Sequence, residues 1–150
     1  MTEPIDFASN TPRHGLPFLI AGQAQKEFFV NEAFTKIDML LHPVVEDELA
    51  APPASPGAGE CWLVAPGPSG LWVGHEGDLA AWDGTQWTFT SPNTFMAVFV
   101  RSSGRLKYYR DGWQWPGQPA APTGGTTIDA EARPSLAQVL QVLKTAGLMA

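Results

Sequence analysis

The sequence has few features that form covalent links or membrane anchors. Cys61 is the single cysteine among 150 residues, so the chain cannot form the internal disulfides of small secreted scaffolds. The N-terminal residues lack the basic and then apolar pattern of a secretory signal. No apolar run approaches the ~18 residues that a membrane-spanning helix needs. We therefore expect that the protein does not insert into a membrane. We also expect that it is assembled in the cytoplasm.

Charge is also scarce. Charged residues make up 16% of the chain, and 15 acidic residues against 9 lysines and arginines give a net charge of −6. Binding to phosphate backbones needs a basic surface, so nucleic acid is excluded as the main partner. Four bases nevertheless gather within ten residues: Arg101, Arg105, Lys107 and Arg110. They form either a solvated strand face or a docking surface for an acidic partner.

Motifs for catalysis are missing as well. The sequence contains no nucleophile elbow and no phosphate-binding loop, and its three histidines lie far apart. His75, Glu76 and Asp78 could form a metal-ligand cluster, but a solvated turn is the favoured interpretation. The adjacent carboxylates of Glu46–Glu48 would point to opposite faces of a strand. We expect a protein that is not an enzyme and that holds no metal or cofactor.

What the sequence does contain begins with an extended arm over residues 1–19 and a helix over 21–41. The helix is predicted from apolar residues at three- and four-residue spacing, and Pro43 disfavours helical backbone at the residue before it. The stripe is formed by Val30, Ala33, Ile37 and Leu40. We expect it to pack on a sheet in the isolated chain and regard it as a candidate interface with other subunits.

Short runs closed by glycine, proline or Asp-Gly follow the helix, and they predict a small antiparallel β-meander. Residues 20–115 would form one helix-plus-sheet domain of the α+β class. The run "TFMAVFV", residues 94–100, is apolar on both faces and should be a central strand. Expected strands also include "GLWVGHEG", residues 70–77.

Tryptophan is used heavily in this region. The chain has six: Trp62, Trp72, Trp82, Trp87, Trp113 and Trp115. Trp82 and Trp87 flank an Asp-Gly turn and should face each other across it. Trp113 and Trp115 have the same parity and stand at the edge of the predicted domain. They either pack in the core or at a protein contact, or they form a platform for carbohydrate.

The last third of the chain predicts a tethered helix. Residues 116–127 are rich in proline, glycine, alanine and threonine and form a linker. Within residues 128–150 a helix should start near Ala132 or Arg133, and Gly147 should cap its end. Its apolar stripe consists of Leu136, Val139, Leu140 and Leu143. A helix of about three turns is marginal alone in water, so this stripe should bind its own domain, sister copies or another protein.

These pieces, in this order, resemble a family of phage-encoded domains of unknown function found in prophages and gene transfer agents. The resemblance covers about Leu16 to Trp115 and rests on "AGQAQKE…NEA", the Pro-rich "LAAPPASPGAGECWLVAPG" and "LWVGHEGDLAAWDGTQWTF". The tail "TTIDAEARPSLAQVLQVLKTAGLMA" also resembles C-terminal helices of such proteins. The resemblance implies a virion component near host-attachment spikes or fibres, and it supplies no catalytic residues.

Taken together, we expect a structural adaptor of a phage-like particle that anchors a spike or fibre. Its partners would be two further copies of itself, a capsid or tail protein, and a distal receptor-binding protein. The alternative is a carbohydrate-binding module that contacts cell-surface polysaccharide.

Overall fold

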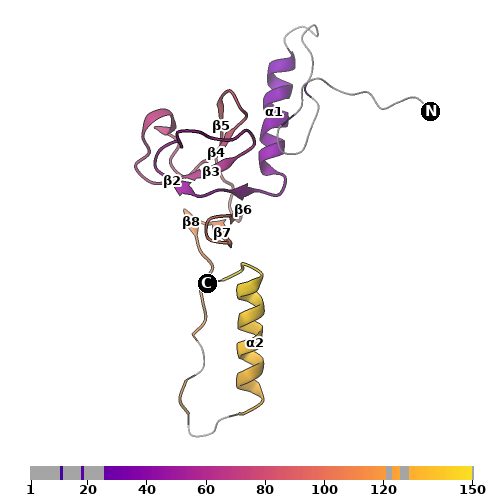
Figure 1. Ribbon diagram of the computed structural model, residues 1–150, viewed down its shortest axis with the longest axis vertical. Coiled ribbons are helices and arrows are strands. Elements are labelled where there is room, and N and C mark those ends of the chain that lie inside the picture. Colours follow the sequence, from indigo (N-terminus) through magenta and orange to yellow (C-terminus); the bar gives the residue numbers. More distant parts are fainter. Residues whose placement is uncertain (1–10, 12–17, 19–25, 121–122, 126–128, 150) are drawn as a thin grey trace, which may run out of the picture.

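The computed structural model describes residues 11, 18, 26–120, 123–125 and 129–149 (Figure 1). The predicted arm therefore lies outside the described residues apart from Thr11 and Phe18, as do residues 21–25 of the predicted first helix. The α+β class is confirmed, because the described residues form two helices and two four-stranded sheets. The helices are α1 (Lys26–Leu40) and α2 (Ala132–Thr145), and a short 3-10 helix, η1, spans Gly70–Trp72.

The strands form two sheets where the sequence predicted one meander. One sheet has the order β1-β6-β7-β8, with β1 (Val44–Val45), β6 (Ala97–Val100), β7 (Arg105–Tyr109) and β8 (Trp113–Gln114). The other has the order β2-β3-β4-β5, with β2 (Glu48–Leu49), β3 (Cys61–Val64), β4 (Leu79–Trp82) and β5 (Trp87–Thr90). The expected central strand is β6, which lies between β1 and β7.

The six residues from Val44 to Leu49 join the two sheets. β1 pairs in parallel with β6, and β2 pairs in parallel with β3. The Arg101 N–H donates to the carbonyl of Val45 at 2.8 Å, while the Glu46 N–H donates to the carbonyl of Cys61 at 2.7 Å. These parallel contacts connect segments distant in sequence, which turn signals between neighbouring strands cannot indicate.

One expected strand is wrong. Residues 70–77 contain η1 and turns, with no strand. Gly70 and Gly74 adopt φ values of 61° and 87°, which are left-handed and incompatible with a continuous strand. Trp72 is fully buried between two exposed neighbours, Leu71 and Val73.

β3 is buried on both faces and separates two apolar clusters. Cys61 and Leu63 face a core that lies between the two sheets and includes Val45 and Val98. The other side chains of β3 face a tryptophan-rich cluster formed by Trp62, Val64, Trp72 and Ala80, with Trp82 and Trp87 packed against it. Burying each large side chain contributes about 1.5–3 kcal/mol, so these clusters are the main stabilising feature.

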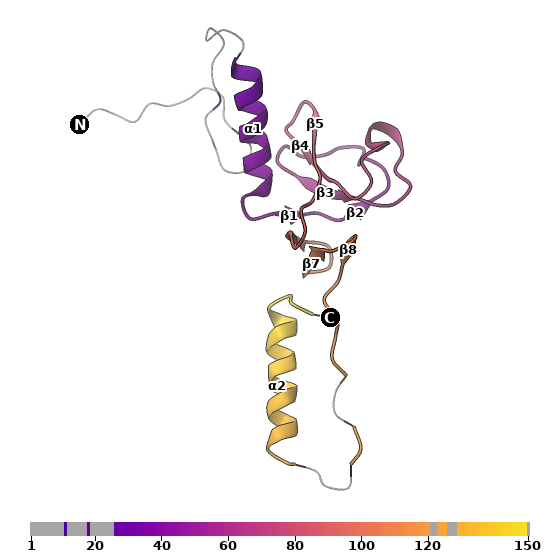
Figure 2. The same ribbon diagram turned by 180° about the vertical axis from the view of Figure 1, so that it is seen from behind.

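α1 lies beside the β2-β3-β4-β5 sheet, as Figure 2 shows. The face of α1 that is buried differs from the predicted one. Met39 and Asp38 are 1% and 2% exposed, and the Thr11 hydroxyl donates to the Asp38 carboxylate at 2.8 Å. Ala33 is exposed and Ile37 is 45% exposed. The expectation that the predicted stripe packs on the sheet is therefore wrong for Ala33 and Ile37, whereas Leu40 packs against the core between the sheets.

Candidate interaction sites

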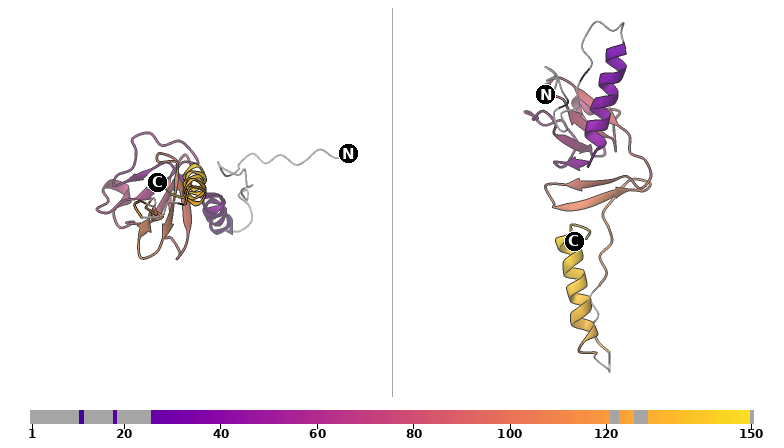
Figure 3. Two further views of the ribbon diagram at one scale, coloured as in Figure 1. Left: turned by 90° about the horizontal axis from the view of Figure 1, so that it is seen from below. Right: turned by 90° about the vertical axis from the view of Figure 1, so that its right-hand side faces the viewer.

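The α2 helix forms an arm that projects from the sheets (Figure 3, right). Residues 116–120 and 123–125 run outward without helix or strand, and α2 returns toward the β7 region. The helix begins at Ala132, as predicted. The Asp129 carboxylate accepts hydrogen bonds from the N–H groups of Ala132 (2.7 Å) and Glu131 (2.9 Å), which lowers the pKa of Asp129 below its ordinary value of 3.8.

The segment that follows α2 is attached to the β1-β6-β7-β8 sheet through a contact between Gly147 and β7, which we call the clamp. Gly147 caps α2 with φ 71°, as predicted, and its carbonyl accepts a hydrogen bond from the Leu106 N–H at 2.8 Å. A Cβ on Gly147 would lie 2.8 Å from the carbonyl oxygen of Gly104, so only glycine permits this approach. Met149, two residues on, is 6% exposed. The arm is therefore attached at a defined point of β7.

α2 leaves several of its large apolar side chains exposed. All residues of α2 are described, and none is buried. Leu136 and Val139 of the predicted stripe are 51% and 54% exposed, and Val142 beside them is 66% exposed. Leu140 and Leu143 are half-buried. Two of the four residues of the predicted stripe are thus exposed, and the sequence did not indicate Val142, which is more exposed than either of them.

Trp113 and Trp115, the residues considered for carbohydrate, have structural partners. Trp113 packs against the core between the sheets, and its indole N–H donates to the carbonyl of Gly77 at 2.8 Å. The Trp115 ring lies against two cations, with Arg105 at 4.6 Å and Lys107 at 4.8 Å from its centroid. This arrangement ties the start of the linker to β7. It does not present two open indoles on one face.

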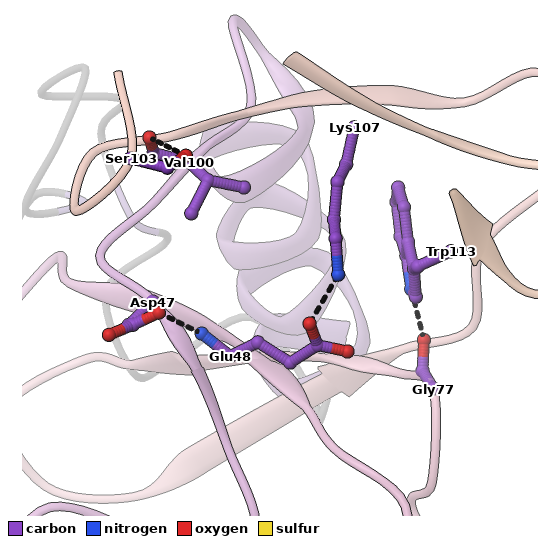
Figure 4. A network of polar contacts seen from close by, with 7 residues as sticks. All are labelled: Asp47, Glu48, Gly77, Val100, Ser103, Lys107 and Trp113. Carbon is purple, nitrogen blue, oxygen red and sulfur yellow. Dashed lines mark hydrogen bonds and ion pairs between the residues drawn. The ribbon is translucent and has the colours of Figure 1, made fainter. Parts of the chain in front are cut away.

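The basic residues of this region also act within the chain. Figure 4 shows Lys107 of β7 reaching the carboxylate of Glu48 on β2, which joins the two sheets. It also shows Trp113 of β8 reaching Gly77, which lies in the turn before β4. Lys107 is 5% exposed. Arg101 forms an ion pair with Glu46 at 3.0 Å on the surface. The sequence showed a cluster of bases, but the acidic partners of Arg101 and Lys107 lie more than fifty residues away along the chain, so the sequence could not indicate these pairs.

The described residues contain no group of three or more metal-ligating side chains. His75 Nδ1 lies 3.0 Å from the Asp78 carboxylate, and the imidazole stacks on Phe89 with 3.6 Å between ring centroids. The sequence favoured a turn here over a metal-ligand cluster of His75, Glu76 and Asp78, and the structure shows a turn at residues 76–77 with a His75–Asp78 pair. Neither described helix is long and apolar enough to cross a membrane.

Comparison with known proteins gives one match. No similar protein of curated function and no similar solved structure was found. The profile of a family described as "Protein of unknown function (DUF2793)" matches residues 30–116, which comprise most of α1 and both sheets. The chain therefore belongs to the DUF2793 family.

Proposed function

We propose that the protein is a structural adaptor of a phage-like particle, in which the α2 arm joins copies of the chain and holds a host-attachment spike or fibre. The observation that carries the proposal is an apolar helix face, centred on Val139 and Val142, that projects from the body with no partner in the described chain. The particle context rests on the resemblance to prophage and gene-transfer-agent domains.

The energetics of α2 favour a partner. A helix of 14 residues has little stability alone in water, and α2 contacts the body mainly through the clamp at its C-terminal end. Burying each of its large apolar side chains would contribute about 1.5–3 kcal/mol. We propose that the α2 helices of other copies cover this stripe, since the attachment of α2 to β7 would orient the stripe in the same way in every copy. Three copies are the state we propose, in keeping with the threefold symmetry common in spikes and fibres.

An adaptor also needs a second surface, and α1 offers one. Ala33 and Ile37 of the predicted interface stripe face outward, and Val30 and Leu40 are half-buried. α1 and α2 lie at opposite ends of the molecule with the sheets between them (Figure 1). We propose that the α1 surface binds a capsid or tail protein and that α2 binds the distal spike or fibre protein.

Light scattering on the whole chain tests the proposal. We expect a mass of three times 16.2 kDa, and we expect Val139→Asp to give a folded monomer because it places a carboxylate in the apolar stripe. The matched control is Gln141→Asp, which adds the same charge two residues away, on the other side of the helix. A monomeric wild-type chain at high concentration, or equal masses for the two variants, would contradict the proposal.

A further inference from the structure

A groove of about 660 Å³ lies between α1 and β5, and no residue of α2 lines it. Figure 2 shows these two elements side by side. The volume falls within the range of small-molecule sites in proteins. Its walls combine aromatic rings from β5, from the turn that carries His75 and from Phe18 with polar side chains from α1 and from the turn between β4 and β5.

The aromatic wall is held in place before any ligand arrives. Trp87 makes ring contacts with Trp62, Trp72 and Trp82 at centroid distances of 5.6, 5.2 and 5.1 Å. His75 is held by its stacking on Phe89 and by Asp78. Preorganised rings cost little entropy on binding, and the apolar faces of sugar rings stack well on such surfaces.

The charges at the groove are largely satisfied within the chain. Glu32 and Lys36 form an ion pair with each other at 2.7 Å. The Oδ1 atom of Asp83 accepts hydrogen bonds from the N–H groups of Thr85 and Gln86 at 2.7 and 2.8 Å. Two acids and one base leave a small negative charge, which disfavours phosphate and other anions. Hydroxyl groups, in contrast, can bond to the exposed Gln86 amide and to the remaining ring nitrogen of His75.

We propose that this groove binds a neutral oligosaccharide, with its sugar rings on the aromatic wall and its hydroxyls bonded to Gln86 and His75. The site differs from the one that the sequence indicated at Trp113 and Trp115. It does not depend on the role of α2, so it can fail or succeed independently of the proposed function.

The test is a titration of the whole chain with neutral tetrasaccharides of glucose, mannose and galactose, and with tetragalacturonate as an acidic probe of equal length. We expect the indole NMR signal of Trp87 to shift with at least one neutral probe, while that of Trp115 stays in place. Gln86→Ala should weaken this binding about three- to tenfold, as expected for the loss of one hydrogen bond.

Gln138→Ala, on the exposed surface of α2, is the matched control and should bind as the wild type does. The proposal is overturned if no neutral probe shifts the Trp87 signal. Binding of tetragalacturonate as tight as that of the best neutral probe would also overturn it, as would a Gln86→Ala variant that binds like the control.

Discussion

The two helices have nearly the same length and similar apolar spacing, yet they relate to the sheets in opposite ways. α1, with 15 residues, lies along a sheet and buries Met39 and Asp38. α2, with 14 residues, buries none of its side chains and touches the body through the residues that follow it. Periodic apolar residues therefore indicate that a helix forms, but not which face is buried or whether the chain itself supplies the partner.

The largest expected effect distinguishes the two faces of α1. Met39→Ala removes a fully buried side chain and should lower the free energy of unfolding by about 2–5 kcal/mol, as for other large-to-small core changes. Ile37→Ala, two residues earlier and 45% exposed, should cost less than about 1 kcal/mol in the monomer. Urea unfolding measures both variants. Equal losses would mean that the predicted stripe is buried after all.

A smaller effect is expected at the clamp that holds α2. Gly147→Ala combines a left-handed backbone with a clash against the Gly104 carbonyl, and should cost about 1–3 kcal/mol while releasing the arm. Gly67→Ala is the matched control, since Gly67 has the same φ of 71° but open space around its Cβ position. Hydrogen exchange at the Leu106 amide reports on the clamp. It should accelerate in the Gly147 variant alone, and equal exchange in both variants would exclude the clamp.

The smallest effect concerns the start of α2. The lowered pKa of Asp129 means that its capping contribution is complete above the unfolded pKa near 3.8 and is lost as the pH falls through the lower, folded value. The amide signals of Glu131 and Ala132 should therefore titrate with a midpoint below 3.8. Asp129→Asn should abolish this titration and leave α1 unchanged. A midpoint at or above 3.8 would show that the cap does not form.

The turns and helix ends could be predicted from the sequence because they depend on residues that are neighbours along the chain. Asp-Gly at residues 83–84 predicted the hairpin in which Trp82 pairs with Trp87, and Gly147 predicted the end of α2. Both depend on backbone conformations that only a few residue types adopt easily.

Features that depend on distant residues were not predictable. The ion pair between Lys107 and Glu48 joins positions 59 residues apart, and spacing along the chain does not reveal it. The same holds for the bond between Leu106 and Gly147. Deleting residues 128–150 would remove this bond and the buried Met149 together with α2.

The central claim is that the exposed stripe of α2 joins copies of the chain. The most direct measurement is oxidative cross-linking of Val139→Cys against Gln141→Cys, since the native Cys61 is buried and does not compete. We expect rapid formation of a disulfide-linked dimer through position 139 and little through position 141, on the other side of the helix. Equal cross-linking at the two positions, or none at position 139, would show that this stripe does not join copies of the chain.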